Sequence, residues 1–388
     1  LINRIANILR YGDAYNSTYL RDDLDENDIA ACKAYIENGT PLTTETQEHL
    51  SVSACAPWRI MAITFTNKAA GELKDRLCAM LGETANDIWA STFHSTCARI
   101  LRRDGERIGY SSHFTVYDTD DQRRLMKSIL KELDISEKSI TPKSILNEIS
   151  RAKDSLISPA EYALTVGDDF RLKIISRAYT TYQKRLEDAD AMDFDDLINK
   201  VVELFKKCPD VLEYYQNRFR YLMVDEYQDT NHAQYTFVRM LAEKSGNLCV
   251  VGDDDQSIYK FRGATIENIL SFENTFQNAT VIRLEQNYRS TQNILDSEMC
   301  IRDRNGTGAM IHLHTAENET DEAERITKII LDGVAAGRKF SDYAVLYRMN
   351  SQSLTFERNF AKSGVPHRII GGTRFYDCLL YTSDAADE

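Results

Sequence analysis

Two adjacent carboxylates, Asp225 and Glu226, follow directly on an apolar run at residues 221–224. A buried parallel strand that ends in this way delivers its acids to the edge of a sheet, where open α/β folds bind ligands. An Asp at that edge can hold Mg²⁺, and a Glu beside it can orient water for attack on a phosphate. For an isolated Asp-Glu pair, a strand followed by a solvated acidic turn is the commoner alternative.

A second apolar run, residues 247–253, also ends in a carboxylate and is soon followed by Gln256. Neighbouring parallel strands would bring this glutamine to the edge that carries the acid pair, where its amide can sense a γ-phosphate or the attacking water. A third cluster, residues 284–290, offers the aromatic face of Tyr288 for a base and the guanidinium of Arg289 for a phosphate. Simple packing of the tyrosine and a surface ion pair of the arginine are the structural alternatives.

The elements around these residues alternate between strand and helix. Strand character at residues 58–65 and 87–93 is followed each time by a helical pattern, at 68–81 and 94–103. This β-α-β-α order is typical of a parallel sheet. Further helices are expected at residues 120–133, 142–153, 159–164, 169–187, 194–206 and 233–242. We therefore predict an α/β fold, a parallel-sheet domain into which an all-helical subdomain is inserted.

The last third of the chain has the pattern of a second α/β domain. It follows a further strand expected at residues 279–284. Within it, strands are expected at 310–314, 343–347 and 367–370, and helices at 321–336 and 351–363. Alternation of this kind again favours a parallel sheet with helices on its faces. We interpret it as the start of a second domain of the same class.

Composition gives weaker indications. The chain has 388 residues, 43% of them hydrophobic and 28% charged, without an apolar run long enough to span a membrane or an opening signal peptide. Its eight cysteines are scattered and form no C-x-x-C pair, so we expect reduced thiols, no zinc site and a cytoplasmic location. A net charge of −13 counts against a nucleic-acid partner, although a local basic groove can coexist with an acidic exterior.

Six segments resemble, in order, motifs of superfamily 1 DNA helicases of the UvrD/Rep/PcrA type. They are residues 63–70, 91–95, 192–197, 224–230, 251–259 and 287–291. Each motif alone is moderately specific, but six in the family order make a chance resemblance very improbable. The resemblance covers residues from about 58 to 295 and continues more weakly from about 310 to 376.

The resemblance implies a role for each residue of the acidic edge. Asp225 would coordinate Mg²⁺ with ATP, and Glu226 would activate the hydrolytic water. Gln256 would couple the γ-phosphate to the DNA site. Tyr288 would stack on the adenine and Arg289 would contact the γ-phosphate. ATP and Mg²⁺ are therefore the expected cofactors.

The resemblance also implies a path for single-stranded DNA. Its expected lining residues are Phe65, Asn67, Thr92, Phe93 and His94, with Tyr259 and Phe261 as stacking surfaces for bases. Phe65 and Phe93 could equally be core aromatics, and His94 could be a helix cap or a satisfied surface histidine. Many relatives have Trp at the position of Phe261, so this chain keeps a smaller stacking face.

The resemblance gives a domain plan. Motor domain 1A, RecA-like, is expected at residues 1–110 and 191–290, helical subdomain 1B at 111–190, and a partial second RecA-like domain, 2A, at 291–377. Residues 14–57 have the character of a surface insertion. Residues 296–304 and 378–388 depart abruptly from the family pattern, and we suspect non-native sequence there.

The implied function is an ATP-dependent DNA helicase or translocase, moving 3′ to 5′ on single-stranded DNA and acting at duplex junctions in repair or replication. The phosphate-binding loop Gly-x-x-x-x-Gly-Lys-Thr and the last family motifs do not occur in this sequence. Because the chain also begins as if inside a helix, we expect a fragment with negligible ATPase activity. The alternatives are the motor subunit of a helicase–nuclease complex and a non-catalytic protein that binds single-stranded DNA.

Overall fold

The computed structural model describes residues 26–27, 30–31, 34, 40–44, 55–136, 140–253, 256, 265, 267–270, 272–276, 279–283, 290–297 and 308–370. The chain forms two compact units, residues 1–282 and 283–388. Most of the expected insertion at 14–57 and all of the tail at 378–388 lie outside the described residues. The two units are described separately below.

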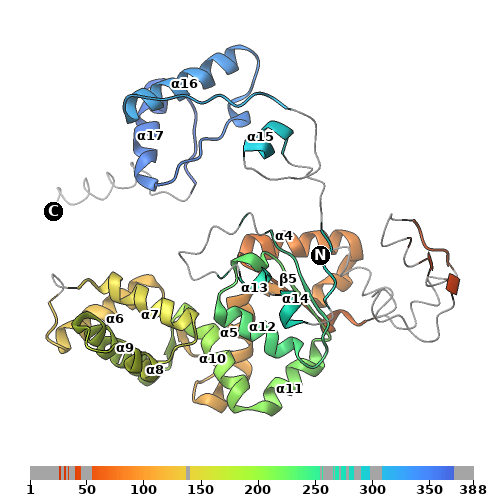
Figure 1. Cartoon of the computed structure of the whole chain (residues 1–388), viewed down its shortest axis with the longest axis vertical. Helices are drawn as coiled ribbons and strands as arrows, with labels where there is room; N and C mark the ends of the chain where they lie inside the picture. The colour runs from red at the N-terminus through yellow and green to blue at the C-terminus, as the bar shows by residue number, and fades with distance from the viewer. Residues whose placement is uncertain are drawn as a thin grey trace, which may run out of the picture. The chain divides into compact units, whose positions relative to one another are not determined.

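A four-stranded parallel sheet lies at the centre of the first unit (Figure 1). Its strand order is β2 (Trp89–Thr92), β1 (Ile60–Thr64), β5 (Tyr221–Val224), β6 (Leu248–Val250). Strands β1 and β5 are buried along their whole length, as expected for parallel strands covered on both faces. The predicted α/β fold class is confirmed.

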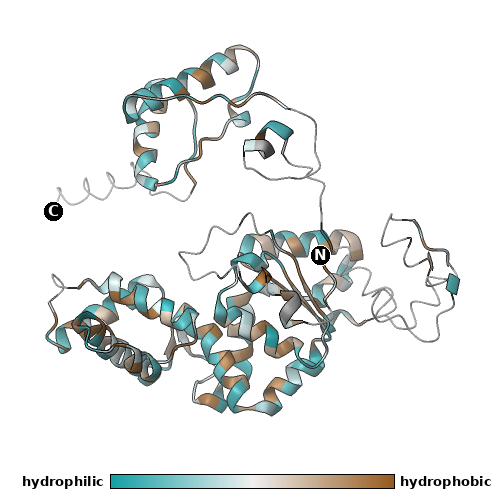
Figure 2. Ribbon diagram, in the orientation of Figure 1, coloured by the Kyte–Doolittle hydropathy of each residue, from teal (hydrophilic) through white to brown (hydrophobic). Residues whose placement is uncertain are grey.

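Helices cover both faces of this sheet, and successive strand residues point into different cores. Ile63 and Val224 belong to a large core beneath α5 (Phe93–Asp104), α10 (Phe194–Lys207), α11 (Pro209–Arg218) and α12 (His232–Ala242). Ala62 and Met223 belong to a smaller core beneath α4 (Asn67–Leu81). This alternation follows from the two-residue period of a strand. Figure 2 shows apolar strands between helices whose outer surfaces are hydrophilic.

Four helices form a separate lobe of the same unit (Figure 1). They are α6 (Thr119–Glu132), α7 (Pro142–Asp154), α8 (Pro159–Thr165) and α9 (Phe170–Asp188). The lobe has its own core, which includes Ile129, Ile145 and Tyr182. At its base β3 (Thr115–Val116) pairs in parallel with β4 (Ala191–Met192), a ladder too short to leave a pattern in the sequence.

The second unit contains the two predicted helices but not the predicted strands. These helices are α16 (Glu319–Ala335) and α17 (Ser353–Lys362), which share a small apolar core. Residues 308–370 are described without a gap and contain no strand, so the strands predicted at 310–314, 343–347 and 367–370 are wrong. Residues 279–283 are not a strand either. A strand needs a ladder partner, and the exposed Leu313 (95%) and Leu346 (93%) lie in segments that have none within 308–370.

The remaining described helices are short. They are α13 (Glu267–Leu270) and α14 (Phe272–Thr275) in the first unit, and α15 (Gln292–Ser297) in the second.

Candidate functional site

The register of the sheet brings the ends of all four strands to one edge. Thr64 pairs with Thr92, and Val224 pairs with both Ile63 and Val250. The residues that follow these strands therefore emerge side by side. The segments after β2 and β1 carry the residues expected to line the DNA path, and those after β5 and β6 carry the acids.

The acid pair occupies the predicted position at the end of β5. Asp225 is half-buried, and its backbone N–H donates to the carbonyl oxygen of Ile63 (3.0 Å). Burial, and then the charge of Glu226, raise the pKa of the Asp225 carboxyl above its ordinary value. A bound cation would relieve both costs, so this carboxylate fits a magnesium ion.

Glu226 is exposed and has an unusual backbone. Its φ of 52° and ψ of 40° place it in the left-handed region, which costs a non-glycine residue about 1 kcal/mol or more. The carboxylate accepts a hydrogen bond from Nε2 of Gln228 (2.7 Å). Strain of this kind is common where a loop must aim one side chain.

Gln256 is exposed on the segment after β6, where its Nε2 donates to Oδ2 of Asp253 (2.8 Å). The backbone N–H of Asp253 in turn donates to Oε1 of Gln228 (3.0 Å). The segments after β5 and β6 are therefore joined by hydrogen bonds. The predicted site residues Tyr259, Phe261, Tyr288 and Arg289 lie outside the described residues.

The two phenylalanines expected on the DNA path have different environments. Phe65 is half-buried and packs edge-on against Phe93, with ring centroids 5.4 Å apart. Phe93 is 1% exposed and also contacts Phe237 in the core, at 6.4 Å. In this conformation Phe93 supports Phe65 from below and is not open to a base, so the core alternative describes it better.

The other residues expected on the DNA path lie at helix starts. Asn67 is exposed at the first position of α4. Thr92 is buried, and its hydroxyl accepts from the backbone N–H of Ser95, which makes it the N-cap of α5. His94 is half-buried, and burial lowers its pKa, which favours the neutral ring.

One exposed aromatic beside these residues was not among the predicted site residues. Phe194 is 51% exposed, and its ring lies edge-on to that of His94 at 5.6 Å. The signal was available, because Phe194 lies within one of the quoted motifs and directly follows the N-cap of a helix.

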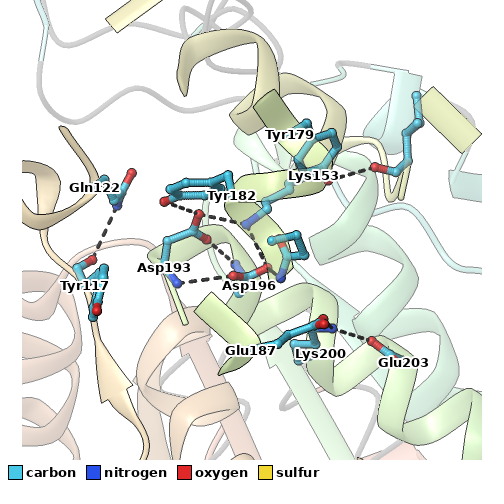
Figure 3. Close-up of polar contacts among 12 residues, drawn as sticks. Tyr117, Gln122, Lys153, Tyr179, Tyr182, Glu187, Asp193, Asp196, Lys200 and Glu203 are labelled. Carbon is cyan, nitrogen blue, oxygen red and sulfur yellow. Dashed lines mark hydrogen bonds and ion pairs between the residues drawn. The ribbon is translucent and has the colours of Figure 1, made fainter. Parts of the chain in front are cut away.

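A buried ionic cluster joins the helical lobe to the sheet domain (Figure 3). Nζ of Lys153, near the end of α7, donates to Oδ2 of Asp193 (2.7 Å) and lies 2.8 Å from Oδ1 of Asp196. The hydroxyl of Tyr182 also donates to Asp193 (3.1 Å). The two aspartates already form the capping box of α10, so the lysine holds the start of a helix that packs on the sheet domain.

One buried cation, Lys153, lies among several aspartates in this cluster, so the pKa of each acid depends on its distance from the lysine and on burial. Burial disfavours an ionised Asp193, yet Lys153 holds its pKa below the ordinary value. Burial raises the pKa of Asp196 to about 6, and burial with the charge of Asp193 raises that of Asp195 to about 6. The residue after the lysine, Asp154, accepts from Nδ2 of the α12 N-cap Asn231 (2.6 Å). Consecutive residues of α7 thus hold the starts of α10 and α12.

Asp154→Asn is expected to reduce the pH dependence of the free energy of unfolding. Burial raises the pKa of Asp154 to about 7, against about 4 in an unfolded chain. Because the folded state binds this proton more tightly, wild-type stability falls as pH rises through that interval. Asparagine keeps the acceptor for Asn231 without the charge. The variant should match the wild-type free energy of unfolding near pH 4. Above pH 7 it should exceed the wild-type value by up to about 4 kcal/mol, since each pKa unit corresponds to about 1.4 kcal/mol.

Urea denaturation at a series of pH values measures this effect. Asp168→Asn, which removes a carboxylate at an exposed position, is the matched control. Parallel stability curves for Asp154→Asn and the wild type would contradict the assignment.

The fold and the candidate site define a class of protein. It is an open parallel α/β domain that carries acids at one edge of the sheet and has an inserted helical lobe. Residues 40–277 match the UvrD/REP helicase N-terminal domain, and residues 282–379 match the UvrD-like helicase C-terminal domain. The chain belongs to the UvrD/Rep helicase family.

Curated relatives of the chain carry the name ATP-dependent DNA helicase PcrA. Those of Staphylococcus aureus are 46% identical to it over 334 residues, which are 83% of this chain and 46% of the relative. Those of Staphylococcus epidermidis are 47% identical over the same length. The chain spans about half the length of these relatives.

Two further observations concern the described residues only. None of their helices has the length and apolar character needed to cross a membrane. No group of three or more His, Cys, Asp or Glu side chains among them is arranged to hold a metal ion.

Proposed function

We propose that this chain is part of an ATP-dependent DNA helicase that moves 3′ to 5′ along single-stranded DNA, in repair or replication. The observation that carries the proposal is the shared sheet edge, where the acids after β5 and β6 are neighbours of aromatic and polar residues after β1 and β2. Membership of the UvrD/Rep helicase family and the names of the PcrA relatives support it. A cytoplasmic location and action at duplex junctions belong to the same proposal.

The acidic side of the edge would carry ATP hydrolysis. Asp225 would hold Mg²⁺, which supplies charge neutralisation for the phosphates when it is bound. Glu226 would accept a proton from the attacking water, and Gln256 would couple the γ-phosphate to the DNA site. Tyr288 would stack on the adenine and Arg289 would contact the γ-phosphate.

The aromatic side of the edge would carry DNA. Phe65, Asn67 and His94 are the predicted residues that are exposed or half-buried there, and Phe194 adds an exposed ring. Thr92 and Phe93 would position these residues from beneath, and Tyr259 and Phe261 would add stacking faces. Stacking of bases on aromatic rings tolerates any sequence, as a translocating motor requires.

The domain plan is part of the proposal. Residues 1–110 and 191–290 would form the first motor domain, 111–190 the helical subdomain, and 291–377 part of the second motor domain. The separate core of the helical lobe and the match of residues 282–379 to a C-terminal helicase domain support this plan.

The test is strand displacement by the chain extended to the full length of its relatives, called the extended protein below. Duplexes with a 3′ or a 5′ single-stranded tail are compared at equal ATP and Mg²⁺. We expect displacement from the 3′-tailed duplex and little from the 5′-tailed one. Equal displacement from both would contradict the polarity, and binding without displacement of either would favour the non-catalytic alternative.

Phe194→Ala is expected to weaken single-stranded DNA binding by about 1–3 kcal/mol, the worth of one stacked base. Fluorescence anisotropy with a labelled oligothymidylate and the extended protein measures the change. Phe170→Ala, at an exposed phenylalanine of the helical lobe, is the matched control and should bind like the wild type. Wild-type affinity of the Phe194 variant would remove this residue from the proposed path.

A further inference from the structure

A continuous line of three hydrogen bonds runs from Gln256 to Glu226. Gln256 Nε2 donates to Asp253 Oδ2 (2.8 Å), and the backbone N–H of Asp253 donates to Gln228 Oε1 (3.0 Å). Gln228 Nε2 then donates to Glu226 Oε2 (2.7 Å). The line connects the segment after β6 with the segment after β5 through one side-chain amide, that of Gln228.

The chemistry of the partners fixes the orientation of this amide. A backbone N–H can only donate, so the oxygen of Gln228 must face Asp253. The NH₂ group is then directed at Glu226, whose carboxylate can only accept when ionised. Gln228 is 1% exposed, so its amide is held within the protein and depends on these two partners. Glutamine is suited to this place because a single planar group supplies both an acceptor and a donor.

Gly252 leaves the space that the amide occupies. A Cβ at this position would lie 2.6 Å from Oε1 of Gln228, closer than real Cβ contacts allow, and 3.2 Å from its backbone nitrogen. It would also lie 2.7 Å from Cδ1 of Ile269. The absence of a side chain at Gly252 therefore lets the two segments meet around Gln228.

The exposed position of Glu226 explains why it needs such a partner. Its left-handed backbone directs the side chain, but an exposed glutamate retains several rotamers unless something holds its carboxylate. The hydrogen bond from Gln228 supplies that restraint. The same amide is bonded to the Asp253 backbone, so movement of the segment after β6 would also move the donor that holds the carboxylate.

We propose that Gln228 is a positioning residue for ATP hydrolysis, which fixes the carboxylate of Glu226 and links it to the segment that carries Gln256. The proposal rests on the proposed function, in which Glu226 activates water and Gln256 couples the γ-phosphate to the DNA site. Gln228 acts through Glu226 and does not touch the nucleotide. Its loss should therefore lower the rate of the chemical step while nucleotide binding is retained.

Gln228→Glu tests this role, because it keeps the size of the side chain and an acceptor for Asp253 but replaces the donor that faces Glu226 by an oxygen. In the extended protein we expect kcat for DNA-stimulated ATP hydrolysis to fall about 100-fold, as for a misplaced catalytic group, with KM for ATP little changed. Gln234→Glu is the matched control, at a buried glutamine whose capping-box role a glutamate also performs. It should keep the wild-type kcat.

Gly252→Ala would displace the same amide by adding a methyl group next to Oε1 of Gln228, without changing a polar group. It should also lower kcat more than it raises KM, and it serves if Gln228→Glu impairs folding, which thermal melting reports. Wild-type kcat in either folded variant, or equal changes in kcat and KM, would overturn the positioning role. A separate experiment tests the proposed function itself: normal ATP turnover by Glu226→Gln would contradict it, whatever the Gln228 and Gly252 variants do.

Discussion

Glu226→Gln in the extended protein is expected to lower ATP turnover by about 10²–10⁴-fold, the usual contribution of a general base. The variant keeps the length of the side chain and an acceptor for Gln228 Nε2, so the local hydrogen bond is preserved. It loses only the capacity to take a proton from water. Binding of ATP and Mg²⁺ should be retained, because the proposed metal ligand is Asp225. Phosphate release and equilibrium binding of a fluorescent ATP analogue measure the two effects.

A matched control separates chemistry from folding in this experiment. Glu243→Gln alters an exposed glutamate at the end of α12 and should turn over ATP like the wild type. Normal turnover by Glu226→Gln would remove this residue from the role of base. Loss of nucleotide binding together with turnover would indicate a binding role instead.

Lys153→Met is expected to destabilise the first unit by about 3–5 kcal/mol, the cost of leaving buried charges without their partner. Methionine fills a similar volume, but Asp193 and Asp196 would then face each other without a cation. The uncompensated charges would lie at the start of α10, so the capping box formed by the two aspartates should loosen as well. The urea midpoint of the chain and the protection of α10 amides from hydrogen exchange measure the effect.

Two further variants identify the cause of that loss. Lys184→Met removes an exposed lysine of α9 and should leave the urea midpoint unchanged. Combining Lys153→Met with Asp193→Asn and Asp196→Asn removes the charges together and should recover part of the stability. A cost for Lys153→Met below about 1 kcal/mol, the typical effect of a point mutation, would contradict the account of the cluster.

The sheet edge could be predicted because its signals are local. Apolar runs that stop at polar residues marked β1, β2, β5 and β6, and the strand at residues 221–224 has the predicted bounds. The helices of the lobe were equally visible from their amphipathic patterns. The structure adds that Asp118 and Ser158 cap two of them. Parallel pairing then placed the strand ends together without further information.

Contacts between distant segments were beyond such local signals. Lys153 and Asp193 lie 40 residues apart, and neither has a neighbour in the sequence that indicates the other. The bridge through Gln228 depends on the register of β5 with β6. The burial of Phe93 could not be predicted from its own segment, because it depends on Phe237 of α12. The strands predicted in the second unit failed for the same reason, since an apolar segment becomes a strand only beside a partner.

ATP hydrolysis by the extended protein, measured as phosphate release with Mg²⁺ at rising concentrations of single-stranded DNA, tests the central claim most directly. If the acids after β5 and β6 and the aromatics after β1 and β2 form one coupled site, turnover should increase with DNA until it saturates and should stop when a chelator removes Mg²⁺. Turnover that is the same with and without DNA, or no turnover at saturating DNA, would contradict the account.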